Sequence, residues 1–298
     1  LTNKTEYMIV LKDSIESVLE SFLTERLSKG LSKNTISFTK GKMGFSSTDK
    51  DLRDIDIQDI SPQLIREYFI ELSKRRNKGG IHASYRAIKA LLLFYESEFE
   101  PPNYRNPIHK VHVKPNNIDP LKGVSIEDVD KLITVCNGRF KLRDKAIFLF
   151  LVSSGVRATE LLNLNVQDVD TITGRVKVIS GKGDKNRLTF INKEARKALR
   201  KYLQTHPANI EAIWLNDEGE RITKSAIDHI LVKYSKLAGI STVGAHDFRR
   251  CFALNCYRQG MEILIISNLL GHSSVEITKR YLDIGENDLK RDYDKLNF

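Results

Sequence analysis

The stretch KAIFLFLVSSGVRATELLNL, residues 145–164, joins a strongly apolar run to two charged side chains, Arg157 and Glu160. Residues 145–155 are apolar nearly all round, which predicts a buried helix that ends at Gly155. An arginine three residues before a glutamate is usually an exposed ion pair worth a few tenths of a kcal/mol. At the end of a buried helix, the same pair can instead be a rigid guanidinium that its carboxylate directs toward a phosphate.

The residues around this stretch predict a domain that is mainly helical. Ser125 is expected to be a helix N-cap, and the later residues have mostly helical patterns. Two alternating segments, 175–180 and 187–191, predict an antiparallel hairpin, because a glycine-rich basic tip joins them. Residues 213–217 form a short strand-like insert. We therefore expect a second domain at residues 121–298 that is mainly α with a small antiparallel sheet.

The amino-terminal residues also have helical periodicity. Apolar residues recur at helical spacing over residues 15–23 and 85–95. Ser61 followed by Pro62 is typical of a helix start, with an N-cap and a proline in the first turn. We expect a small helical domain at residues 1–108. A basic loop between its last two helices contains Lys74, Arg75, Arg76 and Lys78.

A proline-rich segment separates the two expected domains. Five of the seven prolines fall within residues 101–120, which cannot continue a helix and lack strand alternation. We place the linker at residues 109–120. It carries Lys110 and Lys114 with almost no acid, so it could lie along DNA phosphates or act as a solvated hinge.

The overall composition limits the function classes. The formal net charge of +10 favours a polyanionic partner such as nucleic acid, although many basic proteins bind none. No stretch approaches the roughly 20 apolar residues of a membrane span, and the start of the sequence lacks the apolar core of a secretory signal. A cytoplasmic protein with no membrane partner is therefore expected.

Sequence motifs for metals, cofactors and disulfides are missing. The cysteines at 136, 251 and 256 lie outside any CxxC or Cys/His ligand spacing, and they are expected to be reduced thiols. The chain has no GxxxxGK[ST] phosphate loop, no HExxH zinc motif and no paired-acid cluster for Mg²⁺. We expect neither a metal nor another cofactor.

Five further positions could carry chemistry, although each has an ordinary structural explanation. Lys182 lies between two glycines at the hairpin tip, where most lysines are simply solvated. His246 and Arg249 share a helix face at i,i+3, a spacing that often arises by coincidence. His272 could be a capping residue at a helix junction, and Tyr281 could be a packing residue of an amphipathic helix.

These positions fall in four strings that occur in order along the chain. The strings are SSGVRATELLNL (153–164), VISGKGDKNRLTF (178–190), GAHDFRRCFA (244–253) and LLGHSSVEITKRYL (269–282). They resemble the signature boxes of tyrosine recombinases, the phage-integrase and Xer-type enzymes. The resemblance covers residues 121–285 and, more loosely, the amino-terminal domain. It implies a two-domain architecture, in which a SAM-like helical core-binding domain precedes a DNA breaking-rejoining catalytic domain.

The resemblance also implies a role for each candidate residue. Tyr281 would attack a DNA phosphodiester and form a 3′-phosphotyrosyl intermediate, while Lys182 would protonate the leaving 5′-oxygen. Lys185 and Arg187, from the same turn, compete with Lys182 for that role. The phosphate would be held by Arg157, His246, Arg249 and His272, with Glu160 in support. The cations expected to contact DNA are Lys74, Arg75, Arg76, Lys78, Lys110, Lys114, Lys185 and Arg187.

The implied activity is site-specific recombination without metal or ATP. The family implies paired half-sites on double-stranded DNA, a C-shaped grip by the two domains, and a homotetramer working on nucleoid DNA. Two alternatives stay open, a type IB topoisomerase-like relaxase and a catalytically silent DNA-binding regulator. The sequence does not specify the target site, the direction of the reaction, or whether the setting is a phage, a transposon or chromosome-dimer resolution.

The sequence departs from the family pattern at three places. Arg250 stands where the family often has a histidine, and Asp283 replaces a common histidine two residues after Tyr281. Residues 39–52 are richer in glycine and poorer in aromatics than the matching helix of relatives. This leaves open whether that helix is continuous.

Overall fold

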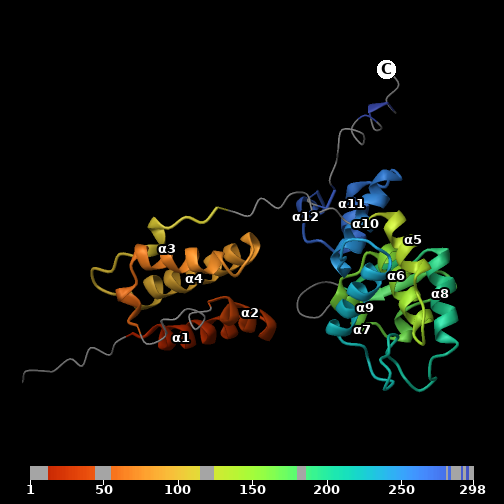
Figure 1. Cartoon of the computed structure of the whole chain (residues 1–298), viewed down its shortest axis with the longest axis horizontal. Helices are drawn as coiled ribbons and strands as arrows, with labels where there is room; N and C mark the ends of the chain where they lie inside the picture. Colours follow the sequence, from red (N-terminus) through yellow and green to blue (C-terminus); the bar gives the residue numbers. More distant parts are fainter. Residues whose placement is uncertain are drawn as a thin grey trace, which may run out of the picture. The chain divides into compact units, whose positions relative to one another are not determined.

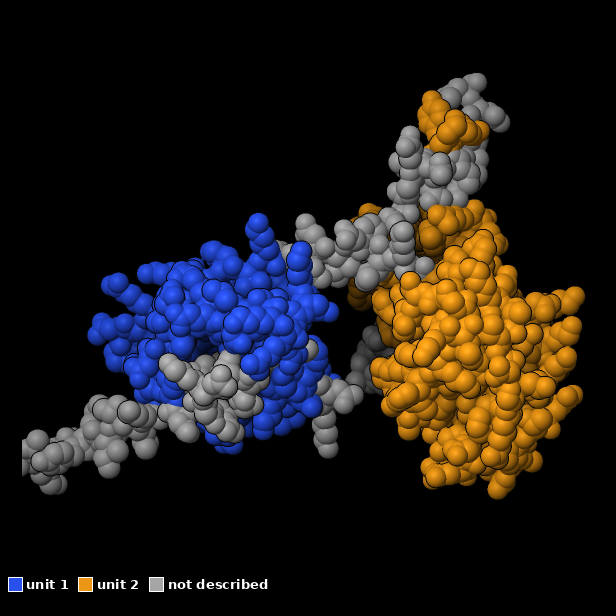
Figure 2. All heavy atoms as spheres, viewed as in Figure 1, with its two compact units in different colours: residues 1–119 blue, residues 120–298 orange. Residues whose placement is uncertain are grey.

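The computed structural model describes residues 13–43, 55–114, 124–179, 186–279, 281–282, 290 and 293–294. The chain divides into two compact units, residues 1–119 and 120–298 (Figure 2). The described parts are mostly helical with a two-stranded antiparallel sheet. The predicted fold class, mainly α with a small antiparallel sheet, is therefore confirmed.

The described residues of the first unit form four helices, α1 (Ile15–Ser28), α2 (Lys33–Met43), α3 (Pro62–Ser73) and α4 (Lys78–Phe99), with short 3₁₀ turns η1 (Ile57–Asp59) and η2 (Pro107–Lys110). The apolar faces of α1, α3 and α4 meet in one core that includes Phe22, Leu91 and Tyr95. As predicted, the Ser61 hydroxyl caps α3 by accepting from the Leu64 N–H at 3.1 Å. Helix α2 includes the first part of the glycine-rich segment 39–52, and positions 44–52 lie outside the described residues.

The start of the predicted linker packs on the first unit. Ile108 and Val111 are buried in its core, and the Tyr85 hydroxyl donates to the Val111 carbonyl at 3.0 Å. The Lys110 carbonyl accepts from Arg66 at 3.0 Å. This segment is therefore fixed by its own apolar side chains, and positions 115–123 lie outside the described residues.

The second unit is built around α6 (Lys141–Ser154), which packs against α5 (Ile126–Thr134), α8 (Lys193–Leu203) and α10 (Ala245–Arg258) (Figure 1). Its side chains from Ala146 to Leu151 are almost all fully buried, as the apolar run predicted. The helix ends at Gly155, which has a φ of +62°. A Cβ there would lie 2.4 Å from the Phe252 ring, so this tight turn needs glycine.

The remaining elements of this unit surround that core. They are α7 (Ala158–Asn163), η3 (Val166–Asp168), β1 (Arg175–Val178), β2 (Arg187–Phe190), α9 (Lys224–Leu237), α11 (Ile263–Leu270) and α12 (Val275–Lys279). The two strands pair with Val178 opposite Arg187, and they are slightly shorter than predicted. The prediction of a strand at 213–217 is wrong. Ile213 and Trp214 are buried in the core, and the backbone around them forms only isolated bridges.

Candidate active site

The turn between α6 and α7 positions the first pair of the site. Arg157 is the N-cap of α7, and its backbone N–H donates to Glu160 Oε2 at 2.6 Å. Its guanidinium Nη1 donates to Glu160 Oε1 at 2.7 Å. The Glu160 side chain is 7% exposed, whereas that of Arg157 is 37% exposed. The pair is therefore a helix-capping interaction with one half-open guanidinium, and not a solvated surface ion pair.

Glu160 is the common partner of three guanidinium groups. Besides Arg157, it accepts two hydrogen bonds from Arg187, at 2.7 and 2.8 Å, and Arg249 Nη1 lies 4.0 Å from its Oε2. Burial alone would raise the pKa of Glu160, but the hydrogen bonds from Arg187 and from the Arg157 backbone outweigh it and lower the pKa to about 2. We name Arg157, Arg187, Arg249 and Glu160 the arginine cluster.

The carboxyl end of α11 accepts one hydrogen bond from each arginine of this cluster. The Leu269 carbonyl accepts from Arg187 Nε at 2.8 Å, and the next carbonyl, of Leu270, accepts from Arg249 Nη2 at 2.7 Å. The Gly271 carbonyl accepts from Arg157 Nη2 at 3.1 Å. The last carbonyls of a helix have no partner within the helix and carry partial negative charge, so they suit cationic donors.

Arg249 is the most enclosed member of the cluster. It is 1% exposed, and its Nη1 also donates to the Gly155 carbonyl at 2.7 Å. Burial and the nearby Arg157 lower the pKa of Arg249 to about 10, so it stays charged at neutral pH. These contacts use two of its five N–H donors, and its buried Nε has no hydrogen-bond partner within the part of the chain that the structure describes.

His272 follows the end of α11 directly. Its Nδ1 lies 2.8 Å from the Thr278 hydroxyl, and among the described residues its buried Nε2 has no hydrogen-bond partner. Burial and the charges of Arg249 and Arg157 lower the pKa of His272 to about 4. The imidazole is therefore neutral near pH 7. If Thr278 donates to Nδ1, then Nε2 carries the proton and is a hydrogen-bond donor.

The Tyr281 ring lies between two histidines and an arginine. Its centroid is 4.9 Å from that of His272 and 5.2 Å from that of His246, and the Arg250 guanidinium carbon lies 5.7 Å from it. The pKa of His246 is lowered by burial and by Arg250 and Arg249. We name Tyr281, His246, His272 and Arg250 the nucleophile side. The sequence interpretation missed Arg250, although its i,i+4 spacing from His246 puts both on one face of α10.

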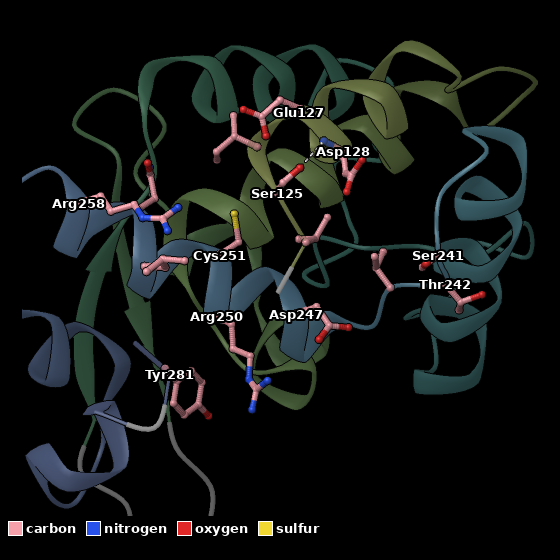
Figure 3. Close-up of a pocket in the computed structure, with 15 residues that line it drawn as sticks. Ser125, Glu127, Asp128, Ser241, Thr242, Asp247, Arg250, Cys251, Arg258 and Tyr281 are labelled. Atoms are coloured by element: carbon pink, nitrogen blue, oxygen red, sulfur yellow. Dashed lines mark hydrogen bonds between the residues drawn. The ribbon is translucent and has the colours of Figure 1, made fainter. Parts of the chain in front are cut away.

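A cavity of about 630 Å³ opens beside Tyr281. It is lined by the start of α5, the loop 241–243 and one face of α10, with Arg250 and Tyr281 next to each other at one end (Figure 3). Tyr281 and Arg250 are thus accessible from this cavity, whereas Arg249 is buried and does not line it.

The structure thus brings six of the predicted site residues together, Arg157, Glu160, His246, Arg249, His272 and Tyr281. The predicted proton donor Lys182 and its competitor Lys185 lie outside the described residues, which resume at Asn186. Arg187 requires a correction. We expected it to contact DNA or to compete as proton donor, but its side chain is 9% exposed and is bound to Glu160 and Leu269.

The other cations expected to contact DNA are on the surface of the first unit, namely Lys74, Arg75, Arg76, Lys78, Lys110 and Lys114. Lys74 and Arg75 also pair with Glu71, at 2.7 and 3.5 Å. The sequence interpretation stopped at the loop and missed Arg86 and Lys89, which continue the exposed basic surface along α4. Their helical spacing from Lys78 could have indicated them.

No cluster of three or more His, Cys, Asp or Glu residues in the described part of the chain could hold a metal ion. None of the described helices is both long and apolar enough to span a membrane.

Residues 124–287 match the sequence model of the phage integrase family. The chain belongs to this family of tyrosine recombinases. It is 31% identical to tyrosine recombinase XerA of Pyrococcus furiosus over 94% of each chain. It is 28% identical to tyrosine recombinase XerC of Leptospira interrogans over 96% of this chain and 94% of that protein.

A solved structure gives the same picture of the fold. The integrase of the Tn1549 transposon, in complex with a circular intermediate DNA, matches with a TM-score of 0.74 and 16% identity over 94% of this chain and 99% of that one. As the four sequence strings predicted, this recombinase is an enzyme that cleaves and rejoins DNA at specific sites. The relaxase and silent-regulator alternatives are not favoured by these similarities.

Proposed function

We propose that this recombinase cuts DNA by attack of the Tyr281 oxygen on a phosphodiester, with Arg157, Arg249 and the two histidines around the phosphate. The observation that carries the proposal is that His246 and His272 lie against the Tyr281 ring, while Arg157 and Arg249 bind the end of α11 directly before His272. The Tyr281 oxygen forms a bond to phosphorus as the bond to the 5′-oxygen breaks. This leaves a 3′-phosphotyrosyl ester and a free 5′-hydroxyl.

The charges of the site fit this reaction. Arg157 and Arg249 would donate to the non-bridging oxygens, where negative charge develops in the transition state. The neutral His272 would donate from Nε2, which has no other partner among the described residues. Lys182 would supply the proton for the leaving 5′-oxygen, as the resemblance implies. The ester keeps the energy of the broken bond, so a new 5′-hydroxyl can reverse the step.

We propose a division of labour along the chain. Residues 1–108 would bind DNA through the exposed cations of the α3–α4 turn, residues 109–120 would connect the two parts, and residues 121–298 would carry out the chemistry. The chemistry fits paired half-sites on double-stranded DNA, held by a homotetramer. We place the reaction in the cytoplasm, on nucleoid DNA, where integration or excision of a mobile element would use it.

Covalent capture tests the proposed reaction. The purified chain is incubated with genomic fragments and denatured, and the DNA ends attached to protein are sequenced. We expect attachment at 3′ ends with free 5′-hydroxyls at a small number of sites, and none with Tyr281→Phe, which keeps the ring but lacks the attacking oxygen. Adducts that persist in Tyr281→Phe, or fragments that are bound but never attached, would contradict the proposal.

A further inference from the structure

Arg187 is buried, charged and outside the set of residues that the proposed reaction uses. It begins β2, directly after the hairpin tip, and its side chain is 9% exposed. Each of its three nitrogens donates to an acceptor, two to Glu160 and one to the Leu269 carbonyl. Three of its five N–H donors are thus used within the protein.

The surroundings of Arg187 are shaped to receive it. Gly271, which ends α11 with a φ of +66°, lies against the arginine stem, and a Cβ there would come within 2.7 Å of Arg187 Cδ. Glycine at this position therefore permits both the turn that leads to His272 and the close approach of Arg187.

The contacts of Arg187 reach both arginines that would bind the phosphate. Glu160, which receives its fork, also binds the backbone and the guanidinium of Arg157. The end of α11, which receives its Nε, also binds Arg249 and Arg157 through the next two carbonyls. One guanidinium thus links the hairpin strand, the start of α7 and the end of α11.

We propose that Arg187 is a positioning residue, which holds Glu160 and the end of α11 so that Arg157 and Arg249 are fixed for the phosphate. This positioning role rests on the proposed function and adds Arg187 to the residues that serve it. The bidentate geometry is essential to this role, because only the arginine fork matches a carboxylate at both oxygens while a third nitrogen binds a carbonyl. The fork also keeps the buried Glu160 ionised, which preserves its hold on Arg157.

The test compares Arg187→Gln and Arg187→Lys with a matched control, Arg175→Gln, at an exposed arginine of the same hairpin. The measurements are duplex binding and the single-turnover rate of adduct formation on a captured genomic site. Displacement of a positioned group by about 1 Å costs on the order of 100-fold, and we expect Arg187→Gln to lose about that much rate with little change in binding. Arg187→Lys should recover part of the rate, and Arg175→Gln should resemble the unmodified chain.

A pH profile separates positioning from a general loss of structure. In the unmodified chain Glu160, with a pKa of about 2, stays ionised in any practical assay. In Arg187→Gln the pKa of Glu160 should rise, because burial remains while the fork is gone. The rate of this variant relative to the unmodified chain should therefore fall further as the pH is lowered from about 8 to 5. A constant ratio over this range would overturn the positioning role.

A double-mutant cycle with Glu160→Gln tests whether Arg187 acts through Glu160. The double variant should be hardly slower than Glu160→Gln alone, since the two residues form one unit. Additive losses, or a loss of binding as large as the loss of rate, would overturn the proposal. The same double-mutant cycle can be measured by thermal unfolding, which needs no activity. Additive losses of stability would show that Arg187 and Glu160 do not interact, and the proposal depends on that interaction. Absence of adduct in the unmodified chain would instead refute the proposed function.

Discussion

The arginine cluster and the nucleophile side are held by different kinds of contact. Arg157 and Arg187 donate to Glu160, and all three arginines donate to carbonyls at the end of α11 or of α6, segments far apart in the sequence. Tyr281 is held by ring contacts and by packing against a small cluster that includes Phe252 and Leu282. Within the described residues, only its backbone forms a hydrogen bond, to the Thr278 carbonyl at 2.9 Å.

This difference indicates which half of the site is prepared before DNA binds. Hydrogen bonds to buried charges fix direction as well as distance, so the protein itself holds the arginine cluster in one arrangement. Ring packing fixes the tyrosine less strictly, which suits a group that must approach phosphorus and later release it. The four predictions below test this division.

The largest effect should come from Lys182, the proposed proton donor, which is not a member of the arginine cluster. Lys182→Ala should bind DNA normally but cleave about 10³-fold more slowly, because an alkoxide leaves poorly without a proton. A substrate with sulfur as the bridging 5′-atom needs no proton, so this variant should recover on it. Single-turnover cleavage of both substrates provides the measurement.

The same measurement can assign the acid elsewhere. Tyr281→Phe, as the control, should stay inactive on both substrates. If the sulfur substrate rescues Lys185→Ala and not Lys182→Ala, then the general acid is Lys185, the other lysine of the hairpin tip. Rescue of an Arg187 variant would place the acid inside the arginine cluster. This would contradict the separate roles given to the arginine cluster and to the rest of the site.

The second prediction concerns the two arginines expected at the phosphate. Arg157→Ala and Arg249→Ala should each slow cleavage by about 10²- to 10³-fold, the usual cost of losing one preorganised donor. Only Arg249→Ala should also lower stability strongly, by roughly 2 to 4 kcal/mol, since it leaves the buried carbonyls of Gly155 and Leu270 without this donor. Thermal unfolding provides the measurement. Equal losses of stability in Arg157→Ala and Arg249→Ala would show that the burial of each arginine does not determine how much it stabilises the fold.

Much of the fold and of the site could be predicted because the signals were local. The end of α6 at Gly155 and the start of α3 at Ser61 and Pro62 follow from turn and capping chemistry at those residues. The convergence of six site residues followed from the family strings. These features need no knowledge of distant contacts.

The rest depended on tertiary contacts that leave no pattern in the sequence. The acceptors that anchor Arg187 and Arg249 include backbone carbonyls, which every residue carries, so no residue type indicates them. The strand expected around Trp214 fails because burial of its side chain, and not pairing of its backbone, fixes that segment. Ile108 and Val111 pack into the first core for a similar reason, because burial of their side chains fixes a segment whose prolines give no helix or strand pattern.

The third prediction addresses the nucleophile side through Arg250. Its cation lies beside the Tyr281 ring and would favour the negative charge that develops on the phenol oxygen. Arg250→Gln should slow adduct formation about tenfold, equivalent to about 1.4 kcal/mol, with unchanged DNA binding. Arg250→Lys should retain most of the rate, since the charge remains. A loss of rate near 10³-fold in Arg250→Gln would mean that the nucleophile side is positioned as strictly as the arginine cluster.

The smallest effect should appear in the pH dependence of stability through His272. Its pKa is about 4 in the folded chain and near 6.5 when unfolded, so the unfolded chain binds more protons between these values. Stability should therefore fall as the pH is lowered from about 7 to 4.5. Glu160, with a folded pKa of about 2, contributes stability that is present above about 4.3 and is lost only below it, so the two windows are separate. Solvent screening of the half-buried ring should limit the fall to about 1 kcal/mol, a few degrees in Tm.

Thermal unfolding at pH 7 and pH 5 measures this contribution. His272→Gln should remove part of the fall in Tm, because glutamine does not titrate. His229→Gln, at an exposed histidine of α9, is the matched control and should leave the fall unchanged. If His272→Gln keeps the full pH dependence, then the ring is not held neutral by the nearby arginines. His272 would then be a cation when its Nε2 approaches the phosphate. Positive charge at the phosphate would come from the nucleophile side as well as from the arginine cluster.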